Sequence, residues 1–225
     1  IIFRFSVKIS TVFMMNQLRH IGRLPFDQGW IQSCFPQHRH LTDKVRQLVA
    51  SGQIIRLKRG LYILGEELTQ QPIERFLVAN HLYGPSYVSL HTALRHYGLI
   101  PEAVYSVQSV TTKVTRAFDT PIGAFFYTHA QPQWFPIGIR IHNEPDLSYL
   151  IATPEKALMD VAQFTAGISM RYNKEVGEWL EDDLRLDMDC LSELNLDILR
   201  QLTPLSHKQT TLETIIRFIE NERRI

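Results

Sequence analysis

Two short groups of cationic and polar side chains have the chemistry to contact a nucleic acid. The first group lies between residues 39 and 47, and the second between residues 56 and 59. Guanidinium and ammonium groups bind phosphate oxygens, whereas amide and carboxylate groups can hydrogen-bond to base edges in the major groove. The candidate contact residues are Arg39, His40, Asp43, Lys44, Arg46, Gln47, Arg56, Lys58 and Arg59.

The first group fits one face of a helix that we expect from about His40 to Ala50. Its apolar residues recur at helical spacing and predict a packed face made of Leu41, Val45, Leu48 and Val49. The opposite face carries His40, Asp43, Gln47 and Ala50, flanked by Lys44 and Arg46. On that face Gln47 could pair bidentately with adenine, and Asp43 could accept from a cytosine amino group. Arg39, Lys44 and Arg46 are better placed as phosphate anchors.

The second group lies on a predicted two-stranded ribbon with the sequence IIRLKRGLYIL. Ile55 and Leu57 alternate with Arg56 and Lys58, so one face of the ribbon should pack while the other is cationic. Gly60 supplies the permissive backbone of the turn, and Arg59 lies at its tip, where it could enter a minor groove.

A short helix within FDQGWIQSCF and a basic turn, PQHRH, precede these two elements. The order helix, turn, helix and ribbon predicts a winged helix-turn-helix over residues 15–65. This region carries eight Lys and Arg residues against two Asp residues, while the formal net charge of the whole chain is +1. Residues 174–225 are instead rich in acids. A basic head with an acidic tail favours a nucleic-acid-facing module joined to a second domain, although a basic helix face can also be only a solvated surface or a protein contact.

The polar run from Gly65 to Pro72 is the predicted joint, and residues 72–225 form the predicted second domain. Helical spacing follows the joint, with one helix ending at Gly98. Residues 105–152 are rich in β-branched and aromatic residues and predict several short strands. A helix then begins with Thr153 as N-cap, Pro154 at its first position and Glu155 in its first turn. We expect this helix to have one apolar face, made of Ala157, Leu158, Val161 and Ala162. The remainder is predicted to be helical, with one apolar stripe through Val176, Trp179, Leu180 and Leu184 and a terminal one through Leu212, Ile215, Ile216 and Ile219. The fold class is therefore α+β: a winged head, a small sheet flanked by helices and a helical C-terminus.

The predicted second domain shows little sign of catalytic chemistry. Asp146 with Glu155 and Lys156 resembles part of a metal-dependent nuclease motif, but adjacent Glu and Lys side chains would diverge from one metal. Pairing between Lys156 and Asp160, four residues apart, explains that helix equally well. No nucleophile elbow, phosphate-binding glycine loop or paired-histidine zinc motif is present in the sequence. We therefore expect no enzyme activity and no cofactor.

The spacing of Cys34, His38 and His40 matches no closed zinc pattern, so no metal site is predicted. The two cysteines are too few for a disulfide framework, and no stretch of the sequence is long and apolar enough to span a membrane. A cytoplasmic location is the expectation. The opening segment is apolar but is interrupted by charged residues, so it lacks the continuous apolar stretch of a signal peptide. Met14 or Met15 is the expected natural start.

Three segments resemble the AbiEi family, the antitoxins of type IV toxin–antitoxin systems, which act in abortive infection. They are SGQIIRLKRGLYIL, YVSLHTALRHYGLIP followed by VYSVQSVTTKVTR, and IATPEKALMDVA. The resemblance covers roughly residues 15–165, and the order and spacing of the three segments are more specific than any one alone. The resemblance implies that a winged head binds inverted repeats in the promoter of its own operon and represses transcription. It also implies that the C-terminal domain opposes a nucleotidyltransferase-like toxin, with or without direct contact.

Carried over residue by residue, the resemblance assigns DNA contact to Arg39, Lys44, Arg46, Gln47, Arg56, Lys58 and Arg59. Structural roles in capping, core and helix dipole go to Ser89, Leu94, Gly98, Glu155 and Asp160. Two alternatives stay open: a stand-alone winged-helix transcription regulator whose second domain senses a ligand or dimerises, and a nuclease.

Overall fold

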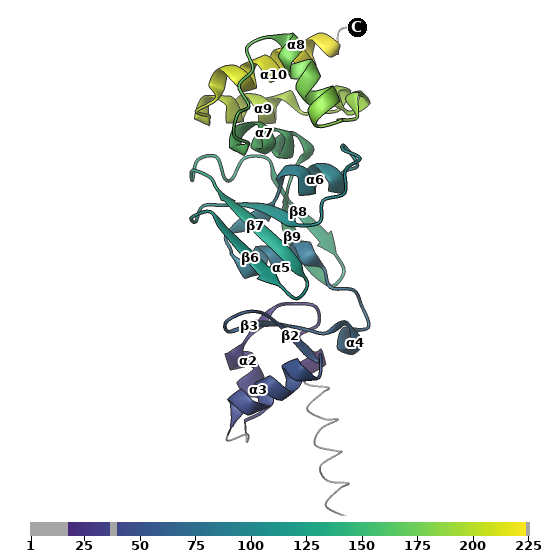
Figure 1. Cartoon of the computed structure of the whole chain (residues 1–225), viewed down its shortest axis with the longest axis vertical. Coiled ribbons are helices and arrows are strands. Elements are labelled where there is room, and N and C mark those ends of the chain that lie inside the picture. Colours follow the sequence, from purple (N-terminus) through teal and green to yellow (C-terminus); the bar gives the residue numbers. More distant parts are fainter. Residues whose placement is uncertain (1–17, 37–39, 224–225) are drawn as a thin grey trace, which may run out of the picture.

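The computed structural model describes residues 18–36 and 40–223 of the chain. Met14, Met15, His38 and Arg39 lie outside the described residues. The molecule is elongated, with an N-terminal head at one end, a curved β-sheet in the middle and a layer of helices at the other end (Figure 1). It is a mixed α+β protein with two separate sheets.

The head unit, residues 18–64, contains two helices and a three-stranded antiparallel sheet in the order β1-β3-β2. Its elements are β1 (Phe26–Asp27), α2 (Gln28–Cys34), α3 (Leu41–Ala50), β2 (Ile54–Lys58) and β3 (Leu61–Leu64). The order of α2, α3 and the β2–β3 ribbon agrees with the prediction. Strand β1 was not predicted, because two residues carry no periodicity and are recognised as a strand only through pairing with β3.

Local signals in the sequence set the ends of these helices. The Asp27 carboxylate accepts a hydrogen bond from the backbone N–H of Trp30 at 2.9 Å and so caps α2. Helix α3 ends at Ala50, and Gly52 follows it with a φ of +71°, which lets the chain reverse while the Gln53 N–H bonds back to the Leu48 carbonyl oxygen. The turn between β2 and β3 contains Gly60 with φ of +79°, the left-handed conformation expected there.

The second unit, residues 66–223, is built around a six-stranded mixed sheet in the order β6-β7-β5-β4-β9-β8. Its strands are β4 (Ser86–Val88), β5 (Val107–Thr111), β6 (Arg116–Thr120), β7 (Gly123–His129), β8 (Ile139–Glu144) and β9 (Leu147–Ala152). Its α-helices are α4 (Glu66–Thr69), α5 (Arg75–Leu82), α6 (Leu90–His96), α7 (Pro154–Phe164), α8 (Asn173–Glu178), α9 (Leu196–Leu202) and α10 (Gln209–Glu222). A π-helical turn (Trp179–Asp183) and two 3-10 turns (Met188–Ser192 and Thr203–Leu205) complete it.

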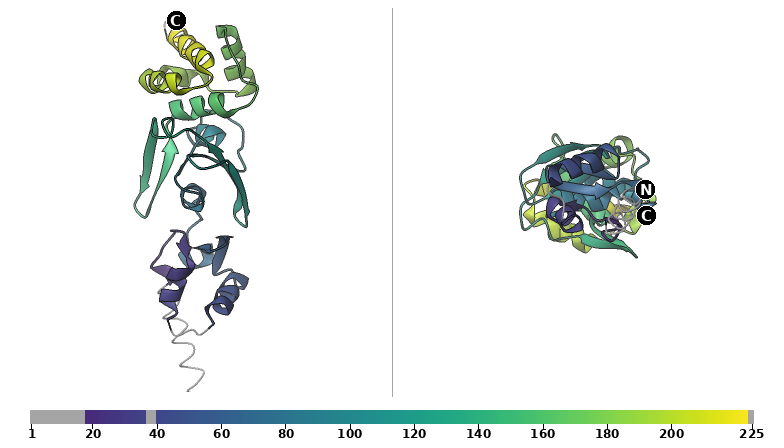
Figure 2. Two further views of the ribbon diagram at one scale, coloured as in Figure 1. Left: turned by 90° about the vertical axis from the view of Figure 1, so that its left-hand side faces the viewer. Right: turned by 90° about the horizontal axis from the view of Figure 1, so that it is seen from below.

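The sheet is larger than predicted because β4 and β6 give weak signals in the sequence. Strand β4 has only three residues and lies directly between α5 and α6, so no alternation develops. Strand β6 reads RAFDT, and its position at the edge of the sheet leaves most of these residues exposed. The sheet curves around α5, which lies between its two halves (Figure 2).

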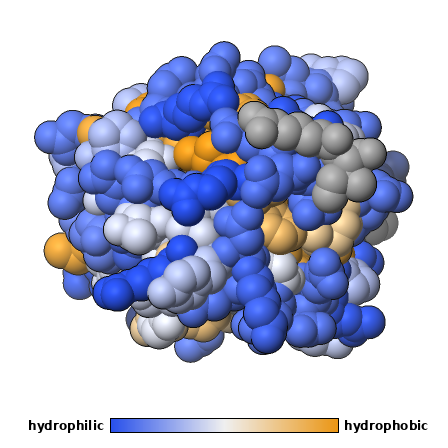
Figure 3. Space-filling view, turned by 90° about the horizontal axis from the view of Figure 1, so that it is seen from above, coloured by the Kyte–Doolittle hydropathy of each residue, from blue (hydrophilic) through white to orange (hydrophobic). Residues whose placement is uncertain are grey.

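The C-terminal helices cover one end of the sheet, and α7 lies between it and them. The predicted apolar stripes are buried: Val176, Trp179, Leu180 and Leu184 in one segment, and Leu212, Ile215, Ile216 and Ile219 in α10. Helix α7 differs from the expectation of one apolar face, because every residue from Glu155 to Gln163 is buried. Seen from above, the helical end of the molecule is mainly hydrophilic, with small separate apolar areas (Figure 3). None of the helices in the described residues is both long and apolar enough to cross a membrane.

The β2–β3 ribbon belongs to both hydrophobic cores. Ile54, Tyr62 and Leu64 are buried in the head core with Leu18, Ile31 and Leu48. Leu57 and Ile63 are buried in the core of the second unit. The face that was expected to pack, Ile55 with Leu57, does pack, but against the second unit.

Polar contacts reinforce the junction between the two units. The Arg23 guanidinium donates to the Pro72 carbonyl oxygen at 3.0 Å, and its other terminal nitrogen lies 3.8 Å from a carboxylate oxygen of Glu144 at the end of β8. The junction therefore involves the linker, the sheet and the ribbon together.

Candidate nucleic-acid interface

Helix α3 presents a polar face away from the head core. On one face of α3, Val45 and Leu48 are buried. On the other, the exposed residues are His40, Asp43, Arg46, Gln47 and Ala50. The distribution of the polar residues agrees with the face predicted from helical spacing. Val49 does not belong to the packed face, since it is 36% exposed. It lies about 80° from Leu41 around the helix axis, at the edge of the apolar stripe.

The cations of α3 already have polar neighbours. An Arg46 guanidinium nitrogen lies 3.4 Å from a carboxylate oxygen of Asp43, with both side chains more than two-thirds exposed. Such a pair contributes little to stability, so a phosphate can readily compete for Arg46. The Lys44 ammonium lies 3.5 Å from the Gln47 amide oxygen and 5.3 Å from the centre of the Phe35 ring. The Lys44 side chain is therefore directed toward Phe35, which directly follows α2.

The three candidate cations of the ribbon do not lie on one surface. Arg56 is exposed on β2 opposite Tyr62, and Arg59 is exposed in the turn beside Gly60. Lys58 turns the other way: its ammonium donates to the Leu82 carbonyl oxygen at 2.5 Å and lies 5.8 Å from the centre of the Phe118 ring. In this arrangement Lys58 is a contact between the units, whereas the sequence pattern placed it on a free cationic face.

A β-bulge explains why Arg56 and Lys58 do not share a face as expected. The register runs Arg56 opposite Tyr62 and then Lys58 opposite Leu61, so one extra residue is inserted into β2. A bulge breaks the two-residue alternation on which the prediction rested and redirects the side chains that follow it.

Residues that were assigned structural roles lie far from this surface. The Thr153 hydroxyl accepts from the Lys156 N–H at 3.4 Å at the start of α7, and the Glu155 carboxylate accepts from the Asn195 N–H at 2.8 Å. Gly98 has φ of +73° just after α6, where the Leu99 N–H bonds back to the Leu94 carbonyl oxygen.

Asp160 lies at the centre of a fully buried polar network. One carboxylate oxygen accepts from the Ser89 hydroxyl at 2.6 Å and the Tyr87 hydroxyl at 3.0 Å. The other accepts from the Trp134 indole N–H at 2.6 Å and lies 3.5 Å from the Lys156 ammonium. The predicted pairing of Lys156 with Asp160 is present, but neither side chain is exposed at all, so the pair cannot be reached from solvent.

The carboxylates considered for a nuclease do not converge. Asp146 lies in the turn before β9, and Glu155 follows the other end of that strand in α7. A six-residue strand spans about 20 Å, which is too far for two ligands of one metal. Within the described residues, no group of three His, Cys, Asp or Glu side chains is arranged to hold a metal ion. Cys34 lies in the head core, and burial raises the pKa of its thiol.

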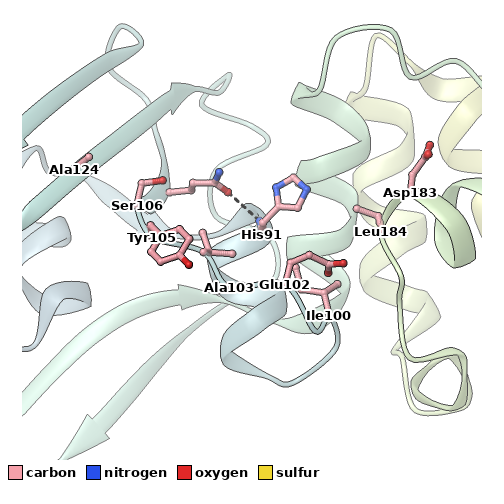
Figure 4. Close-up of a pocket in the computed structure, with 11 residues that line it drawn as sticks. His91, Ile100, Glu102, Ala103, Tyr105, Ser106, Ala124, Asp183 and Leu184 are labelled. Carbon is pink, nitrogen blue, oxygen red and sulfur yellow. Dashed lines mark hydrogen bonds between the residues drawn. The ribbon is translucent and has the colours of Figure 1, made fainter.

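A pocket of about 670 Å³ lies between the sheet and the C-terminal helices. In Figure 4 the His91 ring from α6 lies between the sheet side, with Ser106 and Ala124, and the segment carrying Asp183 and Leu184. Gln108 accepts a hydrogen bond from the His91 N–H at 3.0 Å. The size suits a small molecule. Sequence reasoning missed this pocket because its lining comes from four separate segments without a common motif.

Compared with known proteins, the chain matches no family model and no curated protein sequence.

Proposed function

We propose that this protein is a DNA-binding antitoxin of a type IV toxin–antitoxin system that represses its own operon and counteracts a nucleotidyltransferase-like toxin. The observation that carries the DNA-binding part is the exposed polar face of α3 in a head with a large excess of basic residues. The head's helix, helix and ribbon follow one another as in a winged helix-turn-helix, in which the second helix enters the major groove.

Within this proposal Gln47 reads a base, while Arg46 and the exposed ribbon cations Arg56 and Arg59 bind phosphates. Arg39 belongs to the same set by its position in the sequence. Lys58 is left out of the contact set, because its ammonium is held by the Leu82 carbonyl oxygen. The antitoxin part rests on the resemblance of three segments to the AbiEi family.

DNA binding is tested with a duplex taken from the region upstream of the protein's own gene and a random-sequence duplex of equal length. We expect tighter binding to the upstream duplex and a steep decrease of affinity with salt concentration. Equal affinity for the two duplexes would contradict a role as a specific repressor. Absence of binding to both would remove the DNA-binding proposal.

Antitoxin activity is tested by co-expression with the neighbouring gene. We expect the neighbour to arrest growth when it is induced alone and this protein to restore growth. A toxic neighbour that this protein does not counteract would contradict the antitoxin part and leave DNA binding intact.

A second candidate function is a transcription regulator that responds to a small molecule. The pocket near His91 favours it, because its volume lies in the range of ligand sites and it lies in the second unit, away from the polar face of α3. Adding a metabolite extract to the DNA-binding assay separates the two candidates. A regulator of this kind should bind DNA more tightly or more weakly when the extract is added. Replacing a lining residue by a larger one, Ala124→Leu, should fill part of the pocket and abolish that response.

A further inference from the structure

Three cations of the second unit and the ribbon gather around two aromatic rings. The Arg116 guanidinium lies 5.0 Å from the centre of the Phe118 ring and 5.9 Å from that of Tyr83. The Lys113 ammonium lies 5.2 Å from the Tyr83 ring, and Lys58 lies 5.8 Å from the Phe118 ring. Lys113 and Arg116 are exposed.

In the part of the chain that the structure describes, this cation cluster, Lys58 with Lys113 and Arg116, has no carboxylate partner. Among the residues that the structure describes, no Asp or Glu lies within ion-pair distance of any of the three. The pKa of Lys58 is lowered mainly by burial and further by the charges of Lys113 and Arg116. The aromatic faces attract the cations but supply no negative charge, so mutual repulsion remains.

The cluster is continuous with the candidate surface of the head. Lys58 belongs to the ribbon, and the next residue, Arg59, is exposed in the turn. Helix α3 and the β6–β7 pair also lie on the same side of the elongated molecule, toward the viewer in Figure 1 and on the right in the left view of Figure 2. A DNA duplex rises about 3.4 Å per base pair, so one lying along this side can extend past the head.

We propose that Lys113 and Arg116 bind phosphates of the same duplex that the head contacts, so that the DNA surface continues from α3 and the ribbon onto the edge strand of the second unit. The inference rests on the proposed DNA binding and adds a second contact region to it. Arginine and lysine with uncompensated charge are the side chains that bind phosphodiester oxygens. The aromatic rings hold the two side chains in place, which reduces the conformational entropy lost on binding.

Protection of an exposed sheet edge is the competing explanation, because β6 is an edge strand and charged side chains on such strands prevent association. This explanation predicts that the two charges affect solubility or self-association and leave DNA affinity unchanged.

The test is the double variant Lys113→Gln/Arg116→Gln in the full-length protein. We expect its affinity for upstream and random duplexes to fall by similar factors, and the slope of log affinity against log salt to become shallower by about two, one for each lost phosphate contact. Wild type should also lose affinity when the duplex is shortened beyond the site covered by the head, whereas the double variant should be less sensitive to that shortening.

Arg140→Gln is the matched control. Arg140 is exposed on β8, the opposite edge strand of the same sheet, and stacks 4.6 Å from the centre of the Tyr97 ring. The Arg140→Gln variant should bind DNA with the same affinity and the same salt slope as wild type. Thermal unfolding of each variant shows whether the fold is kept.

An unchanged affinity and slope in a folded double variant would overturn this inference, and leave the proposed function standing if Gln47→Ala still weakens binding to the upstream duplex. A similar loss in Arg140→Gln would also overturn it, because the effect would then follow net charge alone. If wild type binds neither duplex, the proposed function and this inference fail together.

Discussion

The Lys58 ammonium donates a hydrogen bond to the carbonyl oxygen of Leu82 at 2.5 Å, which ties the ribbon of the head to the C-terminal end of α5. A helix C-terminus leaves carbonyl oxygens without partners within the helix and carries partial negative charge, so a cation is favoured there. The contact gives the ribbon a role in holding the two units together, beside any role in binding DNA.

Lys58→Met should therefore weaken the junction between the units. We expect the free energy of unfolding to fall by roughly 1–2 kcal/mol, since a charge-assisted hydrogen bond is lost, and cleavage by a protease in residues 65–74 to become faster. The salt dependence of DNA binding should stay close to that of wild type. Arg56→Met changes an exposed cation on the same strand. It should leave the free energy of unfolding close to that of wild type and make the salt dependence of DNA binding shallower. A shallower salt slope for Lys58→Met would show that Lys58 contacts phosphate after all.

Gln47→Ala should reduce discrimination between DNA sequences. Loss of a bidentate contact to a base lowers the difference in binding free energy between upstream and random duplexes by about 1–3 kcal/mol. Competition binding with the two duplexes measures this difference. Gln209→Ala, the same change at an exposed position of α10, is the control and should have no effect. An equal loss on both duplexes would exclude base reading by Gln47.

Gly60→Val should strain the turn of the ribbon. A Cβ at this position would meet no atom of the described residues within 4 Å beyond its chain neighbours, so the cost arises from the φ of +79° alone. We expect the free energy of unfolding to fall by about 1–2 kcal/mol, measured by chemical denaturation. Gly60→Asn should cost less, because Asn tolerates the left-handed region. Equal stability of the Val variant and wild type would contradict this account of the turn.

Asp160→Asn should be strongly destabilising, because it leaves the Lys156 charge buried without its ion-pair partner. The expected loss is about 3–5 kcal/mol in a denaturation experiment. Glu178→Gln removes a carboxylate from an exposed pair with Lys174, also four residues apart and at the same 3.5 Å separation, and should cost no more than about 0.5 kcal/mol. Similar losses for both variants would mean that burial does not control the cost.

The stability of the fold should depend on pH through Lys156. Burial lowers the pKa of this group to about 8, although Asp160 opposes the shift. The unfolded chain therefore binds more protons than the folded chain between about pH 8 and the ordinary lysine pKa of about 10.4. Lys156 should make the free energy of unfolding rise with pH across this window, and its contribution should be constant well below pH 8, where the group is protonated in both states.

Urea denaturation of wild type and Lys156→Met at several pH values between 7.5 and 10 checks this expectation. The comparison removes the contributions of other titrating groups, and the difference in stability between the two proteins should change in favour of wild type as pH rises. A difference that does not vary with pH would show that Lys156 has the same pKa in both states.

The sequence by itself determined the features that depend on neighbouring residues. Helical spacing located α3 and the buried stripes of the C-terminal helices, and the types of Thr153, Pro154 and Gly98 indicated where helices begin and end. The pairing of Lys156 with Asp160 was visible because four residues make slightly more than one helical turn. The polar face of α3 also followed from spacing, so the outline of the candidate interface could be drawn without coordinates.

Only the tertiary structure decided what the ribbon and α7 contact. The second face of the ribbon is covered by a unit that begins later in the chain, and the bulge after Arg56 turns Lys58 toward Leu82, 24 residues away. The partners of Asp160 are more distant still: Ser89 and Tyr87 are separated from it by 71 and 73 residues. Strand pairing and burial depend on which distant segments meet, and one sequence read along its length shows only which segments are able to meet.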